Sequence, residues 1–181
     1  MGLAADTHGF VEVDEYLRTR AHKIYAAGDV AGPPWLETTG AREGANAVKN
    51  ALTGRRLSIN YQSVPAAVFT QPQVAVVGLT ETEAIKRFGR CESRTVALTS
   101  VSKAAITNDI RGVAKMVIHA KSRKILGFHV VSPSAAEFIH APALAIQRGL
   151  TVEELSEMVS VFPTYAEVVR IAADGFKRPS S

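Results

Sequence analysis

A carboxylate stands at the end of an apolar run in the amino-terminal part of the sequence. The segment HKIYAAGDVAG, residues 22–32, reads as a buried strand that ends on Gly28 and Asp29. Ligands of open α/β sheets bind beyond the carboxyl ends of strands, and a glycine there lets the backbone turn and a ligand come close. A carboxylate in that place can accept hydrogen bonds from two hydroxyl groups, as on a ribose or ribityl chain. The alternative is that Asp29 only shapes a turn or caps a helix.

The elements that would position this aspartate are two strands and a helix. FVEV (residues 10–13) alternates as a strand, and residues 23–27 form a second, nearly continuous apolar strand. After the turn-rich GDVAGPP, the segment LETTGAREGANAVKNALTG predicts a helix that Gly54 stops. Its apolar residues fall at helical spacing, namely Ala41, Ala45, Val48 and Leu52.

The pattern changes near residue 60, where we place a domain boundary. Beyond it, AAVFT, VAVVG and CESRTVAL read as strands, and GVAKMVIHA and ILGFHVV flank the KSRK turn (residues 121–124) as a β-hairpin. We expect the basic turn to be solvated. An antiparallel sheet with helices packed against it is therefore predicted.

Helices of this second part begin at capping-box patterns. The pairs are Thr80 with Glu83, Thr151 with Glu154, and Thr164 with Glu167. The segment PSAAEFIHAPALAIQRG predicts one further helix, kinked at Pro142 and ended by Gly149.

Composition narrows the class of protein. Hydrophobic residues make up 46% and charged residues 21% of 181, which is ordinary for a globular chain. No apolar stretch approaches the roughly 20 residues of a membrane span, and no signal peptide is evident, so we expect a cytoplasmic protein. The net charge of +4 is scattered rather than gathered in a stripe, which argues against nucleic acid binding. Cys91 is the single cysteine and is expected to be an inert thiol, and no metal site is predicted.

The sequence resembles the pyridine nucleotide-disulfide oxidoreductases. Thr19 to Val30, TRAHKIYAAGDV, resembles their second flavin-contacting motif, in which a Thr precedes an apolar strand ending in Ala-x-Gly-Asp. The resemblance continues in order over nearly the whole chain. Within the family, the sequence looks most like the mercuric reductase branch, with the dihydrolipoamide dehydrogenase branch close behind. The segments that favour mercuric reductase are VDEYLRT, AVFTQPQVAVVG, SRTVAL and the Phe-Pro of VFPTYAE. The segments that carry the family resemblance further are LETTGAREGANAV, VPAAVFTQPQVAVVGLTETEA, GFHVVSPSAAEFIHAPALAIQRGLTVEELSEMV and FPTYAEVVRIAADGF.

This resemblance implies roles for particular residues. Asp29, with Gly28 before it, matches the aspartate that binds the ribityl and pyrophosphate region of FAD. Leu36, Glu37 and Thr38 match the segment whose backbone lies against the flavin ring, where a helix N-terminus offers free N–H groups and a positive dipole end.

The resemblance also implies the domain organisation. Residues 1–60 match the carboxyl-terminal end of an α/β FAD-binding domain, with its last strands and helix, and residues 61–176 match an α+β dimerisation domain. Residues 177–181 are expected to form a flexible tail. A homodimer is implied, and we expect its apolar interface on the helix face that contains Phe138, Ile139 and Ile146, with the terminal helix beside it.

Several parts of a complete family member have no counterpart in this sequence. It has no GxGxxG loop, no CxxxxC pair and no NAD(P)-binding domain, so it resembles the last third of such an enzyme. In a complete enzyme, electrons would pass from NAD(P)H through FAD and a cysteine pair to Hg(II) or a related small-molecule or metal-ion acceptor. The fragment alone is expected to be inactive. A non-catalytic homodimerisation module and a dihydrolipoamide dehydrogenase-like reductase with an altered substrate are the alternatives.

The segment FPTYAE departs from the dihydrolipoamide dehydrogenase pattern. Phe162 stands where those members have an acid–base histidine, and phenylalanine transfers no proton. Mercuric reductases also lack this histidine, but they usually carry a carboxyl-terminal cysteine pair, and the sequence here ends KRPSS. Tyr165 could line the active site that faces the partner subunit. Glu167 could orient a catalytic group or only cap a helix.

Overall fold

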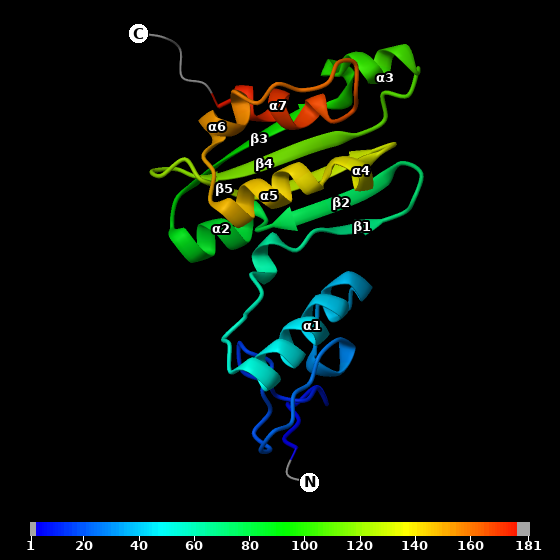
Figure 1. Cartoon of the computed structure of the whole chain (residues 1–181). Helices are drawn as coiled ribbons and strands as arrows, with labels where there is room; N and C mark the ends of the chain where they lie inside the picture. Colours follow the sequence, from blue (N-terminus) through cyan, green and yellow to red (C-terminus); the bar gives the residue numbers. More distant parts are fainter. Residues whose placement is uncertain (1–2, 177–181) are drawn as a thin grey trace. The chain divides into compact units, whose positions relative to one another are not determined.

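The computed structural model describes residues 3–176, and they form two compact units (Figure 1). One unit ends at Tyr61 and the other begins at Gln62. The tail predicted at residues 177–181 lies outside the described residues.

The carboxyl-terminal unit is built on a five-stranded, wholly antiparallel sheet. Its strand order is β1-β2-β5-β4-β3 (Figure 1). The strands are β1 (Ala66–Val68), β2 (Gln73–Gly78), β3 (Cys91–Ala97), β4 (Val113–His119) and β5 (Ile125–Ser132). The predicted antiparallel sheet and its central hairpin are confirmed.

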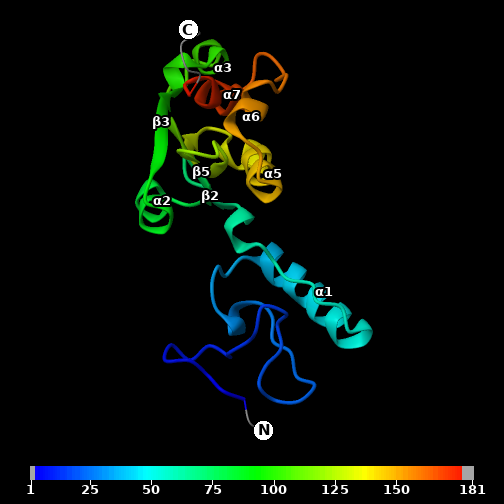
Figure 2. The same cartoon turned by 90° about the vertical axis from the view of Figure 1, so that its left-hand side faces the viewer.

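One face of this sheet carries the core. Alternate residues along the strands are buried there because successive side chains of a strand point to opposite faces. They include Val77, Met116, Phe128 and Val130, each no more than 2% exposed. Helices pack over this face, as the view along the sheet shows (Figure 2). They are α4 (Ala135–Phe138), α5 (His140–Arg148), α6 (Val152–Ser156) and α7 (Glu167–Asp174), while the short α3 (Ser102–Ile106) follows the 3-10 turns at residues 98–100.

Helix α2 (Glu81–Phe88) contacts the opposite face through β3 and β4. Its predicted capping box is confirmed: the Thr80 hydroxyl accepts the Glu83 N–H, and the Glu83 carboxylate accepts the Thr80 N–H. These bonds hold the pKa of Glu83 below its usual value. Glu81 also bonds the Ser93 hydroxyl at 2.9 Å and pairs with Lys115, so α2 is tied to both strands.

The single kinked helix predicted for residues 133–149 is wrong, because two helices form instead. Proline has no N–H to donate, and its ring clashes with the carbonyl four residues earlier, which belongs to Phe138. Helix α4 ends at that residue and α5 starts at His140, so Pro142 lies in a first turn, where no donor is needed. Gly149 ends α5 in the left-handed conformation (φ 66°), as predicted.

The predicted dimer face on these helices is also wrong. Phe138 and Ile139 are 8% and 2% exposed and belong to the core of the unit itself. Ile146 packs against the same core as a partly buried residue. The helices direct their apolar face toward the sheet, because the sheet has no other cover on that side. Phe138 and Ile139 are therefore not free to form an interface, whereas Ile146 keeps part of its surface exposed.

Of the other two capping boxes, one forms completely. Thr151 and Glu154 exchange both bonds at the start of α6, whereas Ala166 is the N-cap of α7. The Thr164 hydroxyl donates to the carbonyl of Val161 instead of capping the helix. The box predicted with Glu167 is thus half made, through the Thr164 N–H to the Glu167 carboxylate at 3.3 Å.

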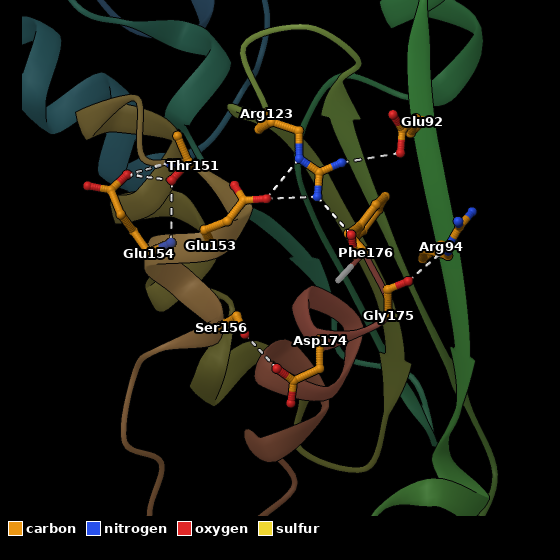
Figure 3. Close-up of polar contacts among 10 residues, drawn as sticks. All are labelled: Glu92, Arg94, Arg123, Thr151, Glu153, Glu154, Ser156, Asp174, Gly175 and Phe176. Atoms are coloured by element: carbon orange, nitrogen blue, oxygen red, sulfur yellow. Dashed lines mark hydrogen bonds and ion pairs between the residues drawn. The ribbon is translucent and has the colours of Figure 1, made fainter. Parts of the chain in front are cut away.

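The KSRK turn joins β4 to β5 as predicted, but it is not wholly solvated. The Arg123 side chain is only 15% exposed and donates to Glu153 and to the Phe176 carbonyl, both at 2.8 Å (Figure 3). It also pairs with Glu92 of β3 at 3.3 Å. Arg94 donates to the Gly175 carbonyl at 3.0 Å, so two guanidinium groups bond the last carbonyls after α7.

In the amino-terminal unit, the strands predicted at residues 10–13 and 23–27 do not form. Single bridges join Ala5 to Val11 and Arg18 to Tyr25. A strand needs a paired neighbour along its length, and beyond those bridges these segments make only scattered backbone hydrogen bonds among the described residues, such as the Val11 N–H to the Val30 carbonyl at 2.8 Å. Helix α1 (Glu37–Thr53) is confirmed, with Gly54 as its left-handed C-cap.

Helix α1 buries polar residues and exposes apolar ones. Ala41, Ala45, Val48 and Leu52 all lie on its exposed side, with Leu52 81% exposed. The buried side carries Thr39, Glu43, Asn46 and Asn50 at the same helical spacing. Asn50 exchanges hydrogen bonds with the Leu57 backbone and donates to the Tyr16 carbonyl. The inner side of the helix packs against irregular loops, whose backbone N–H and C=O groups need polar partners. This explains why its buried side is polar and its apolar residues are exposed.

Within residues 3–176, no helix is both long enough and apolar enough to cross a membrane. The same residues contain no cluster of three or more His, Cys, Asp or Glu side chains that could hold a metal ion.

Candidate functional site

The predicted flavin-contacting aspartate lies in a tight turn of the amino-terminal unit. Gly28 has φ 77°, a left-handed value that favours glycine, and Asp29 begins a 3-10 turn, Asp29–Ala31. The N–H groups of Ala31 and Gly32 donate to the carbonyls of Gly28 and Asp29. Asp29 is exposed, and no donor among the described residues bonds its carboxylate. The side chain therefore caps no helix and is available to a ligand.

The beginning of α1 lies against this turn. A Cβ atom on Gly40 would stand 3.2 Å from the Gly28 Cα, so the two backbones approach closely. Leu36 is the N-cap in an extended conformation and makes no side-chain cap, and Glu37 and Thr38 follow as exposed residues of the first turn. The first N–H groups of this 17-residue helix are therefore not bonded by a capping side chain. The structure brings the five predicted cofactor residues to one region of the unit.

Sequence reasoning missed a buried glutamate behind this turn. Glu43 is 4% exposed, and its Oε2 accepts the Gly28 N–H at 2.6 Å. Its Oε1 accepts the Tyr61 hydroxyl at 2.7 Å. The signal that could have found it is the polar set Thr39, Glu43, Asn46 and Asn50, which repeats at helical spacing as clearly as the apolar set does.

Tyr165 and Glu167 belong to the other unit and bond within it. The Tyr165 hydroxyl lies 2.7 Å from the Thr107 Oγ1 and donates to the Asp109 carbonyl at 3.3 Å. The Arg111 guanidinium bonds Asp109 through two donors and holds the pKa of that carboxyl below its usual value. Glu167 is 7% exposed.

Phe162 and Cys91, which the sequence analysis also considered, lie in different surroundings, one exposed and the other partly buried. Phe162 is 68% exposed, beside the exposed Val161. The Cys91 thiol contacts the Glu81 carbonyl at 3.8 Å, and burial raises its pKa, which lowers its thiolate fraction.

Comparison with known proteins defines the class. Residues 64–173 match the family model described as the pyridine nucleotide-disulphide oxidoreductase dimerisation domain, and residues 1–54 match the pyridine nucleotide-disulphide oxidoreductase model. The chain belongs to this family of oxidoreductases and flavoproteins.

Its curated relatives include mercuric reductases. The chain is 36% identical to the mercuric reductase of Bacillus cereus over 99% of its own length and 28% of that protein. It is also 36% identical to that of Streptomyces lividans, over 97% of its own length and 37% of the relative. The chain thus spans about a third of the length of the curated relatives it matches.

Solved structures agree with this assignment. LpdA from Mycobacterium tuberculosis matches with a TM-score of 0.89 and 29% identity, over 98% of this chain and 39% of that one. The HOCl-induced flavoprotein disulfide reductase RclA from Escherichia coli matches with a TM-score of 0.86 and 26% identity, over 97% and 41%.

Proposed function

We propose that this chain supplies the flavin-contacting end and the pairing domain of an FAD-dependent, NAD(P)H-using reductase of the mercuric reductase type. The observation that carries this proposal is the Gly28–Asp29 turn packed against the start of α1. The ordered similarity to mercuric reductases over 99% of the chain supports it.

The residues of the turn fit FAD. Asp29 presents an exposed carboxylate that accepts hydrogen bonds from hydroxyl groups, as the ribityl chain offers. Gly28 of the turn and Gly40 of α1 have no side chains at the point where their backbones approach each other. The N-terminus of α1, at Leu36, Glu37 and Thr38, has N–H groups that no side chain caps and carries the positive dipole end, which favours an electron-rich ring edge.

When bound, FAD supplies the hydride acceptor and electron carrier between NAD(P)H and a disulfide or metal acceptor. The chain itself would orient the flavin and exclude alternative poses. Tyr165 and Glu167 would lie on the acceptor side of the site that faces the partner subunit, where the Glu167 carboxylate accepts a hydrogen bond from the Thr164 N–H. The exposed Phe162 transfers no proton, which favours an acceptor such as Hg(II) over a dithiol that needs acid–base catalysis.

Homodimerisation belongs to the same proposal. The match of residues 64–173 to a dimerisation domain favours pairing of two copies of the chain. A non-catalytic homodimerisation module would pair in the same way. Analytical ultracentrifugation of the chain at several concentrations measures its molecular mass and so distinguishes a dimer from a monomer.

A chimera tests the function. The part of the Bacillus cereus mercuric reductase that precedes the region of similarity is joined to this chain, and NAD(P)H oxidation is followed with Hg(II) and with lipoamide as acceptors. We expect turnover with Hg(II) and little with the dithiol. A folded, flavin-containing chimera that reduces lipoamide but not Hg(II) would support the dihydrolipoamide dehydrogenase-like alternative.

A further inference from the structure

The function proposed above gives no role to the buried carboxyl group of Glu43. This residue lies on the inner side of α1 and is only 4% exposed. Removing a carboxyl group from water is unfavourable unless its oxygens accept hydrogen bonds in return. Its contacts therefore show what the residue does.

Each oxygen of Glu43 has one short bond, and the two bonds lead in opposite directions along the chain. The Gly28 N–H lies 2.6 Å from Oε2, and the Tyr61 hydroxyl lies 2.7 Å from Oε1. The Gly28 residue leads directly into Asp29, and Tyr61 is the last residue of the amino-terminal unit. The Glu43 carboxyl group thus links the Gly28–Asp29 turn to Tyr61 at the end of the amino-terminal unit.

We propose that Glu43 is a positioning residue that fixes the Gly28–Asp29 turn, and that Tyr61 in turn fixes Glu43. This inference rests on the proposed function, in which Asp29 binds a flavin hydroxyl. Gly28 has a left-handed φ of 77° and has little conformational restriction of its own. Since a glycine before Asp29 would otherwise allow several orientations, an external acceptor for its N–H selects one of them.

The chemistry of the two donors predicts a graded response to substitution. The Gly28 N–H can only donate, whereas the Tyr61 hydroxyl can donate or accept. Glutamine at position 43 can therefore keep its carbonyl oxygen on Gly28 and turn its amide group toward Tyr61. Leucine offers neither atom an acceptor. Glu43→Gln should retain the turn, and Glu43→Leu should lose it.

Tyr61 provides a spectroscopic readout of the same contact. The pKa of its phenol is raised, first by the partial burial of a residue that is 45% exposed, and then by the hydrogen bond to Glu43 and the charge of that residue. Removing the carboxyl group should bring the Tyr61 pKa back toward the ordinary value, as seen by ultraviolet titration of the phenols. Tyr61→Phe identifies which of the four tyrosines gives the signal.

Asn50 supplies the matched control. It is 2% exposed on the same side of α1, but it bonds the backbone of Tyr16 and Leu57 rather than the turn. Asn50→Leu should destabilise the unit without releasing Gly28. A purely structural role of Glu43 would make the two leucine variants behave alike.

The test combines amide hydrogen exchange on the 181-residue chain with flavin affinity of the chimera described above. We expect the Gly28 amide to exchange at least about tenfold faster in Glu43→Leu, and little faster in Glu43→Gln or Asn50→Leu, since tenfold corresponds to about 1.4 kcal/mol. FAD affinity should fall by a similar factor in Glu43→Leu alone. Unchanged Gly28 exchange in Glu43→Leu, or equal losses in both leucine variants, would overturn the inference. Absence of flavin from the unmodified chimera would instead contradict the proposed function.

Discussion

Arg123 donates a hydrogen bond of 2.8 Å to the carbonyl of Phe176, and its guanidinium carbon lies 5.9 Å from the centre of the Phe176 ring. The same side chain bonds Glu153 and Glu92, so one residue of a hairpin turn joins β3, the start of α6 and the end of the α7 segment (Figure 3). We predict that this residue stabilises the carboxyl-terminal unit.

Replacing Arg123 by alanine should lower the free energy of unfolding of this unit by about 2 kcal/mol. The loss follows because the Phe176 carbonyl and two carboxylates lose a largely buried donor. Urea denaturation followed by circular dichroism measures it. Arg90→Ala is the matched control, because Arg90 is exposed and bonds none of the described residues. Equal midpoints for the two variants would show that the Arg123 contacts contribute nothing.

Two glycines with nearly the same backbone conformation should respond differently to alanine. Gly78 and Gly89 have φ of 78° and 76°, but a Cβ on Gly78 would lie 2.2 Å from the Leu126 carbonyl oxygen, whereas none of the described atoms lies within 4 Å of one on Gly89. Both variants carry backbone strain of about 1 kcal/mol. Gly78→Ala should cost about 1–3 kcal/mol more, because β2 must move away from β5. Similar melting temperatures would contradict the close strand approach.

A second glycine pair tests the contact between α1 and the Gly28–Asp29 turn. Gly44 lies inside α1 with open space around it, so Gly44→Ala should stabilise the helix by roughly 0.5–1 kcal/mol. Gly40→Ala should lose that gain, because its methyl group meets the Gly28 Cα at 3.2 Å. Thermal unfolding monitored by helical circular dichroism compares the two. An equal gain in both variants would mean that α1 and the turn are not in contact.

The capping box of α2 predicts an acid-sensitive contribution to stability. The pKa of Glu83 is lowered first by the Thr80 hydroxyl and then by the Thr80 N–H. A carboxyl group with a lowered folded-state pKa stabilises the fold above its unfolded pKa, and this contribution is lost as the pH falls through the folded value.

Thr80→Ala should therefore cost about 1 kcal/mol at neutral pH and less at low pH, where Glu83 is protonated in both proteins. Thr80→Ser keeps the hydroxyl and should behave like the wild type. Denaturation curves recorded across the acid range measure the difference. A cost for Thr80→Ala that stays constant with pH would show that the carboxylate takes no part.

The sequence predicted the elements whose signals are local. Alternation of apolar residues predicted β4 and β5, and the Thr-x-x-Glu pattern predicted the starts of α2 and α6, because these depend on neighbouring residues alone. The break at Ile139 followed from Pro142, although the pattern indicated a kink rather than two helices.

Features that depend on distant partners were missed. Residues 23–27 have the composition of a strand, but among the described residues they find only one bridging partner, at Arg18. Arg123 looked like a solvated turn residue because Glu92, Glu153 and Phe176 are far away in the sequence. Glu43 was missed for the same reason, since its donors are 15 and 18 residues away.

Flavin binding by the chimera tests the central claim most directly. FAD is titrated into the chimera and into its Asp29→Ala variant, with Glu157→Gln as a surface control, and bound flavin is measured by fluorescence quenching. We expect about one FAD per chain in the unmodified chimera and the control, and at least about tenfold weaker binding in Asp29→Ala, because a charge-assisted hydrogen bond contributes about 1.5–3 kcal/mol. Equal affinity of the Asp29→Ala variant and the unmodified chimera would contradict the account.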